Sequence, residues 1–260
     1  MAKLRRISHT PDQTNRLRQA TARRSLECQP EIAFVADFLV DLAEHAAHPS
    51  FAKLRGQAET IKRGGTLITA QFLEIERSSQ EFAGAMNAIR GNVGDLTRER
   101  PKETTLKSYN SKNKNGLAPH RDSNLGADPA LIGMVSLRGL RQSALWVVPE
   151  TVIFPGSDRE MMERSTREAC LTRIRGYLGP DLIELTPFDV ATQAPGDVTL
   201  IDERKKHGGE WRDPKLGPVA IWHSVYAECS DPMQSTGDVR DPGYVLSLIT
   251  RNRHANAAIV

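Results

Sequence analysis

The chain of 260 residues is 39% hydrophobic and 26% charged with a net charge of +3, which is ordinary for a globular protein of one large domain or two small ones. No run approaches about 18 consecutive apolar residues and the N-terminus lacks an apolar signal segment, so we expect neither a membrane span nor secretion. Three dispersed cysteines without a C-x-x-C pair argue against a disulfide framework or a zinc cluster and favour the cytoplasm.

Residues 1–28 are polar and basic, and they include Arg5, Arg6, Arg23 and Arg24. A stretch of this kind is typical of a solvated, partly disordered arm or of an arm that contacts phosphate groups. We therefore expect a basic, flexible arm over residues 1–28 and a single domain over residues 29–260.

Residues 1–100 predict a helical layer with some sheet extension, outside the core of the fold. Residues 30–48 read as a helix, because Pro30 suits a first turn and apolar residues then recur at helical spacing. The run over residues 66–77 follows Gly64 and Gly65 and is typical of a strand. A short helix is expected over residues 80–90.

From Thr104 the pattern changes to short β-runs separated by turn residues. Strands are expected over residues 104–110, 117–123, 131–137, 143–148, 182–185, 198–202, 219–227 and 244–250. A capping box at Ser157 and Glu160 predicts an inserted helix over residues 157–177. The pattern indicates an α+β protein with a sandwich or jelly-roll core over about residues 104–252.

One stretch of the predicted core carries candidate metal ligands. His120 and Asp122 form an H-x-D pair, and residues two apart in a strand point to the same face. Two histidines and one carboxylate on one face are a typical set for Fe(II) in oxygenases. His207 is the preferred third ligand, because the chain turns back soon after Gly196. His223 is the alternative, although its place inside a long β-run is typical of a packed residue.

The order of these motifs resembles that of the Fe(II)/2-oxoglutarate dioxygenases, most closely the phytanoyl-CoA hydroxylase-like branch. The segments that carry the resemblance are PHRD at 119–122, SALWVVPE at 143–150, PGDVTLID at 195–202, KKHGG at 205–209 and VAIWHSVYA at 219–227. The resemblance implies a double-stranded β-helix (cupin-like jelly roll) with iron bound by His120, Asp122 and His207. The WHSV segment is similar to the distal-histidine strand of alkylated-base repair dioxygenases, which favours His223.

The resemblance also implies the cofactors and the reaction. Fe(II) and 2-oxoglutarate would act with O2, and with ascorbate as a reductant, to hydroxylate a small organic molecule and to release succinate and CO2. The family places an arginine on the last core strand for the distal carboxylate of 2-oxoglutarate. Arg251 fits that role only if His223 is the ligand, and Lys107 and Tyr109 are candidates with either histidine.

Two other functions remain open from the sequence. HRD followed by Asn124 is similar to oxygenases that oxidise 5-methylcytosine and thymine, so a nucleobase oxygenase acting on DNA or RNA is the second choice. The third is a metal-free jelly-roll binding protein, in which the H-x-D pair is coincidental. The sequence does not specify the substrate, the type of oxidation or the oligomeric state.

Overall fold

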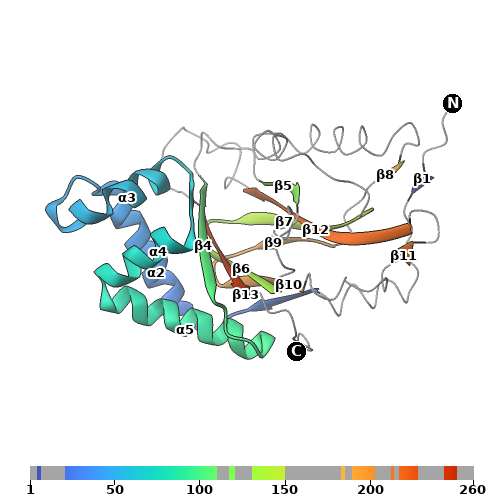
Figure 1. Cartoon of the computed structure of the whole chain (residues 1–260), viewed down its shortest axis with the longest axis horizontal. Helices are drawn as coiled ribbons and strands as arrows, with labels where there is room; N and C mark the ends of the chain where they lie inside the picture. The colour runs from blue at the N-terminus through green and yellow to red at the C-terminus, as the bar shows by residue number, and fades with distance from the viewer. Residues whose placement is uncertain are drawn as a thin grey trace.

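The computed structural model describes residues 5–6, 21–109, 117–120, 131–149, 183–184, 189–202, 212–213, 217–227 and 243–250. Within this part of the chain, a group of helices lies beside two antiparallel sheets (Figure 1). The expected mixture of helices and antiparallel sheet is therefore confirmed for the described residues.

The helices come between residues 29 and 97. They are α2 (Gln29–Glu44), η1 (Pro49–Leu54), α3 (Arg55–Lys62), α4 (Thr69–Ser78) and α5 (Gln80–Thr97). The predicted first helix is confirmed as α2, with Pro30 in its first turn, although it ends before His48. The predicted short helix is longer than expected, because Val93 and Thr97 continue the buried stripe of α5 beyond Arg90.

The predicted strand over residues 66–77 is wrong. Only Thr66–Leu67 (β3) pairs with another strand, and the helix α4 follows it. Phe72 and Ile75 are both fully buried, and their spacing of three residues gives a helix one apolar face. The side chain of Gln71 accepts a hydrogen bond of 3.1 Å from the backbone N–H of Ile68, which satisfies a donor at the start of the helix. The burial of Phe72 and Ile75 on one face of a helix outweighed the β propensity of the residues at the start of the segment.

The larger sheet has six strands in the order β2-β10-β6-β13-β4-β3, all of them antiparallel to their neighbours. Besides β3, these strands are β2 (Thr21–Ser25), β4 (Glu103–Tyr109), β6 (Leu131–Arg138), β10 (Asp197–Asp202) and β13 (Gly243–Thr250). The predicted strands that begin near residues 104, 131, 198 and 244 are thereby confirmed.

The smaller sheet has the order β11-β12-β7-β9, and β5 pairs with the other edge of β12. Its strands are β5 (Leu117–His120), β7 (Arg141–Pro149), β9 (Asp189–Gln193), β11 (Arg212–Asp213) and β12 (Gly217–Ala227). A separate parallel pair joins β1 (Arg5–Arg6) to β8 (Ile183–Glu184). The predicted inserted helix over residues 157–177 lies outside the described residues.

The expected arm over residues 1–28 needs a correction. Thr21–Ser25 is the edge strand β2, which pairs along its whole length with β10. Arg23 lies directly opposite Thr199 in that ladder. The end of the predicted arm is therefore part of the sheet, because its backbone groups complete the edge of β10. Deleting residues 1–28 would remove a strand.

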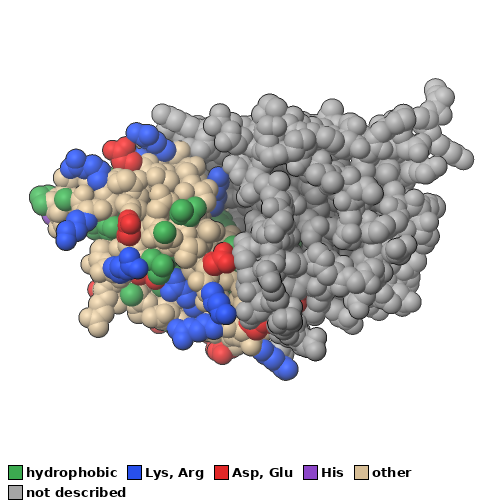
Figure 2. All heavy atoms as spheres, in the orientation of Figure 1, with side chains coloured by type: hydrophobic (Ala, Val, Ile, Leu, Met, Phe, Trp, Pro, Cys, Tyr) green, Lys and Arg blue, Asp and Glu red, His purple; other side chains and the backbone are tan. Residues whose placement is uncertain are grey.

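The main apolar core lies between the helices and one face of the larger sheet. Side chains from α2, α4 and α5 pack there against Leu106, Val135, Leu200 and Leu246 of the sheet. The helical layer thus contributes to the core. The sequence-based expectation that it lies outside the core is wrong. None of the described helices is long and apolar enough to cross a membrane. Figure 2 shows basic and acidic side chains interspersed over the visible face of these helices.

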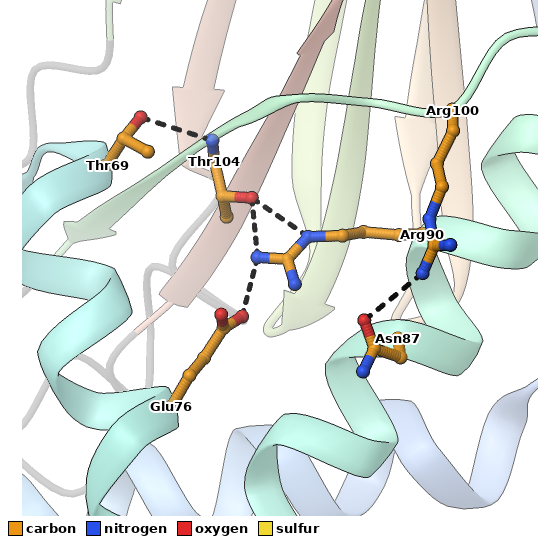
Figure 3. A network of polar contacts seen from close by, with 6 residues as sticks. All are labelled: Thr69, Glu76, Asn87, Arg90, Arg100 and Thr104. Atoms are coloured by element: carbon orange, nitrogen blue, oxygen red, sulfur yellow. Dashed lines mark hydrogen bonds and ion pairs between the residues drawn. The ribbon is translucent and has the colours of Figure 1, made fainter.

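A buried ion pair fastens the helices to β4. Arg90 of α5 contacts Glu76 of α4 at 2.5 Å, and both side chains are largely buried (Figure 3). The same guanidinium donates hydrogen bonds of 2.8 and 3.2 Å to Oγ1 of Thr104 on β4. The backbone N–H of Thr104 in turn donates to Oγ1 of Thr69, at the start of α4. Three elements, α4, α5 and β4, therefore meet at one polar point.

Candidate metal and co-substrate site

The two sheets meet through the face of the larger sheet that is turned away from the helices. On β10, Val198 and Leu200 pack toward the helices, so Thr199 between them belongs to the opposite face. Arg23, which pairs with Thr199, donates hydrogen bonds to Oγ and to the backbone carbonyl of Ser143 on β7, at 2.5 and 3.2 Å. Ser143 and Leu145 are each 1% exposed, which identifies the buried face of the smaller sheet.

The two candidate histidines on this sheet occupy opposite positions. His223 of β12 is the register partner of His120 of β5, and on its other side it is the partner of Leu145 of β7. Opposite positions of an antiparallel ladder belong to the same face of the sheet. His120, His223 and Leu145 therefore occupy one row across three strands, on the face to which the buried Leu145 belongs.

The other predicted site residues are placed only in part. Asp122, His207 and Arg251 lie outside the described residues. Lys107 is partly buried and lies opposite Val245, on the face of β4 that is turned away from the helices. Tyr109 is the last residue of β4 and pairs with Gly243. Among the side chains that the structure describes, no group of three His, Cys, Asp or Glu residues gathers as a metal site.

A group of polar side chains that the sequence analysis did not single out lies between the sheets. Nη1 of Arg23 donates to Oγ1 of Thr199 at 2.9 Å and to Ser143 as described above. Gln193 of β9 is 2% exposed, and neither polar atom of its amide has a hydrogen-bond partner within the structure. Its neighbour Thr192 is exposed, so Gln193 belongs to the inner face of the sheet, as Ser143 does.

A tight turn between β9 and β10 positions Gln193 and Thr199. Gly196 has a φ of 90°, a conformation that suits glycine, and its N–H donates to the carbonyl of Ser136. The carboxylate of Asp197 accepts hydrogen bonds from the N–H of Ala194 at 2.9 Å and from the hydroxyl of Ser25 at 2.5 Å. The Pro-Gly-Asp segment therefore joins the two sheets and fixes β2 against them.

The sequence held one signal of this polar group. In the segment PGDVTLID, Thr199 alternates with Val198 and Leu200, which places a hydroxyl on the second face of a strand that is buried from Val198 to Asp202. Arg23 carried no such signal, because β2 was read as part of a basic arm. Gln193 lies on β9, which the sequence analysis did not predict.

The cysteine that the structure describes is not part of this site. Cys28 precedes α2 and is buried in the core beneath the helices. Desolvation raises the pKa of its thiol, and a hydrogen bond to the backbone opposes that shift. A thiol held in its neutral form is a poor nucleophile and a poor metal ligand.

Comparison with known proteins gives likenesses in structure only. No family model and no curated protein matches the sequence. AviO1 from Streptomyces viridochromogenes Tue57 has a TM-score of 0.47 at 11% identity, over 92% of this chain and 92% of that chain. HygX from Streptomyces hygroscopicus with iron bound has a TM-score of 0.41 at 14% identity, over 96% and 92%.

HygX has also been solved with nickel and 2-oxoglutarate bound, and that structure has a TM-score of 0.40 at 12% identity, over 96% and 92% of the two chains. YcfD, a ribosomal oxygenase from Escherichia coli, has a TM-score of 0.34 at 12% identity, over 73% of this chain and 31% of that chain. All of these TM-scores are below 0.5, so the likeness in chain path is partial.

Proposed function

We propose that this chain is a non-haem oxygenase that uses Fe(II) and 2-oxoglutarate to oxidise a small organic molecule. The observation that carries the proposal is the position of His223 directly opposite His120, in the ladder next to the H-x-D pair. Two imidazoles from adjacent strands and a carboxylate two residues after His120 make a typical ligand set for Fe(II). His120, Asp122 and His223 would then hold the metal.

The choice of His223 departs from the preference for His207 that the sequence suggested. The objection to His223 was that the chain would need a long excursion to bring it to His120. The β5–β12 pairing answers that objection, because it brings the two backbones side by side at these residues. His207 remains the alternative third ligand, and variants of the two histidines distinguish them.

The order of the strands supports a double-stranded β-helix as the fold. From β4 to β7 each successive strand lies in the other sheet, and β10, β12 and β13 alternate in the same way. A chain that winds between two facing sheets in this manner forms a jelly roll. The open end of such a barrel is a usual place for a ligand pocket.

The atoms of the proposed ligand residues are of types that bind Fe(II). Neutral imidazole nitrogens and a carboxylate oxygen are good ligands for Fe(II), and three of them leave coordination positions open. When bound, the iron would supply the oxidising chemistry with O2, while 2-oxoglutarate is converted to succinate and CO2. The β5–β12 ladder would hold the two histidines in one row with Leu145, which is buried and would help to exclude water.

Three residues are proposed for the carboxylate groups of 2-oxoglutarate. Arg251 directly follows Thr250, the last residue of β13 in the larger sheet. A guanidinium in that place can bind a carboxylate with two parallel hydrogen bonds. Lys107 and Tyr109 continue the inner face of the neighbouring strand β4 and would contribute a point charge and a hydroxyl.

Turnover without the natural substrate tests this function. The purified chain is incubated with Fe(II), ascorbate, O2 and 2-oxoglutarate, and succinate is measured over time. We expect slow succinate formation by the unaltered chain, and none above background by His120→Ala. An iron-loaded chain that forms no succinate would contradict the use of 2-oxoglutarate. A chain that binds no divalent metal would instead support the binding-protein alternative.

A further inference from the structure

We propose that the inner face of β9 binds the primary substrate, and that Asp189 selects a substrate with a protonated amino group. The proposal rests on the proposed function, because the molecule to be oxidised must lie beside the iron. None of the proposed metal or co-substrate residues lies on β9. Its residues Asp189, Ala191 and Gln193 alternate along one face of the strand and would form a substrate strip between the two sheets.

Asp189 belongs to the row of the two histidines. It is the register partner of Leu145 on β7, and Leu145 is in turn the partner of His223 on β12. Asp189 is therefore on the same face as His223 and two strand spacings from it, which is about 10 Å between backbones. His120 is one spacing further away, too far for Asp189 to share a metal ion with both histidines. A small molecule beside the metal can span the distance to Asp189.

Gln193 shows that polar atoms on this face lack partners within the chain. Its side chain is 2% exposed, and neither the nitrogen nor the oxygen of its amide has a hydrogen-bond partner. Such a group is costly in a folded protein, because it loses its hydrogen bonds to water and gains none in return. A ligand group that both donates and accepts, such as a hydroxyl, would satisfy the amide.

Ala191 lies between these two polar residues on the same face. It pairs with Ser143, which is 1% exposed, yet Ala191 itself is partly exposed. The chain therefore does not fully cover this part of the inner face. Asp189 and Gln193 are four residues apart, or about 14 Å along the strand. The substrate strip thus has a carboxylate in the metal row, a small residue in the middle and an unpaired amide at the other end.

The charge of Asp189 indicates the chemical class of the ligand. A carboxylate opposite the buried Leu145 is costly to desolvate unless a cation pairs with it. A protonated amino group supplies both the positive charge and the donors that a carboxylate needs. A substrate of the same shape without the amino group would leave the carboxylate unpaired, which is how a polar site rejects an apolar analogue.

Arg23 is the alternative partner for Asp189. Its guanidinium donates to Oγ of Ser143, and Asp189 is a diagonal neighbour of Ser143 in the β7–β9 ladder. An ion pair between Arg23 and Asp189 would make the aspartate a structural residue. The two roles predict different results, because an internal ion pair contributes to folding without a ligand. A substrate-binding carboxylate acts only when a cation is bound.

Binding of two matched probes to the full chain without added metal tests the charge selection. 6-Aminohexanol and 1,6-hexanediol have the same length and differ in one end group, which is a protonated amine in the first and a hydroxyl in the second. We expect the amino alcohol to bind at least about tenfold more tightly, as measured by titration with saturation-transfer NMR. Asp189→Asn should abolish that difference. Equal binding of the two probes, binding of neither, or a preference that survives in Asp189→Asn would overturn the proposal.

Gln193→Leu tests the other end of the substrate strip. It should weaken the binding of both probes at least about threefold, because each probe ends in a hydroxyl that can meet the amide. Thr192→Ala is the matched control, since Thr192 is exposed on the opposite face of β9 and should leave the binding of both probes unchanged. Unaltered binding by Gln193→Leu would contradict a strip that includes the amide. This variant also keeps the proposal testable if Asp189→Asn does not fold.

Stability distinguishes substrate binding from the internal ion pair. Asp189→Asn should keep the melting temperature of the unaltered chain. A drop in melting temperature that Arg23→Gln reproduces, and that the double variant does not enlarge, would show that the two residues act as a pair. That result would contradict a substrate-binding role for Asp189.

Iron content makes failure of the substrate strip distinguishable from failure of the proposed function. Asp189→Asn should retain the iron content of the unaltered chain after reconstitution, because Asp189 is not a proposed ligand. Loss of iron in that variant would contradict a role confined to the substrate. Failure of the proposed function would appear as an unaltered chain that binds no iron. The probe titration needs no metal, so it tests the substrate strip in either case.

Discussion

His223 and His120 are register partners in the antiparallel ladder of β12 and β5. The two residues are remote in sequence, and they meet because the chain returns through the smaller sheet beside β5, the strand that ends at His120. Leu145 continues the same row on β7 and is 1% exposed. The opposition of these two histidines in the ladder is the observation on which the proposed metal site rests.

Tyr244 offers a test of the core that does not depend on the site. Its side chain is fully buried and its hydroxyl has no hydrogen-bond partner within the structure. Tyr244→Phe should therefore leave the free energy of unfolding at pH 7 unchanged or raise it by up to about 1 kcal/mol. Urea unfolding measures this, and a loss of stability would show that the hydroxyl is paired.

The same residue predicts a dependence on alkaline pH. Burial raises the pKa of the Tyr244 phenol in the folded chain above its value of about 10 in the unfolded chain. The unfolded state then releases its proton first, so this contribution to stability is complete below pH about 10 and is lost as the pH rises further. The unfolding free energy should fall more steeply above pH 10 in the unaltered chain than in Tyr244→Phe.

The ion pair of Arg90 and Glu76 should be sensitive to removal of one partner. Their side chains are 13% and 10% exposed, so Glu76→Gln leaves a largely buried guanidinium without its counter-charge. We expect a loss of about 3 kcal/mol in the free energy of unfolding. The matched control is Glu59→Gln, which breaks the exposed pair with Arg63 and should cost less than about 1 kcal/mol. Equal effects of the two variants would contradict the structural role of the buried pair.

Gly196 should tolerate no side chain. Its φ is 90°, and a Cβ atom built there would overlap the side chain of Gln29. Gly196→Ala should lower the free energy of unfolding by about 1–3 kcal/mol, measured by urea unfolding. Gly84→Ala is the control, because Gly84 lies on α5 with open space around it and should gain up to about 1 kcal/mol. A neutral Gly196→Ala would show that the turn between β9 and β10 rearranges freely.

Local pattern was enough to predict much of the fold. Alternating and apolar runs identified β4, β6, β10, β12 and β13, and helical spacing identified α2. Local pattern gave a wrong prediction for α4. The segment begins with β-branched residues, but its buried residues, Phe72 and Ile75, have helical spacing. Local pattern also failed for β2, because a basic edge strand is recognised only through its partner β10.

The site was harder to predict, because it depends on pairing across the sheet. The H-x-D pair was visible as a motif, whereas the choice between His207 and His223 requires the register of β12 against β5. Gln193 and Ser143 are polar residues in short strands, and their burial comes from the second sheet that covers them. Sequence spacing carries no information on such contacts.

The most direct test of the metal site is the iron content of three variants. His120→Ala, His223→Ala and His207→Ala are reconstituted with Fe(II) without oxygen, desalted and measured for bound iron, with circular dichroism as the check on folding. If His120 and His223 are both ligands, His120→Ala and His223→Ala lose stoichiometric iron and His207→Ala retains it. Retention by His223→Ala together with loss by His207→Ala would contradict the assignment.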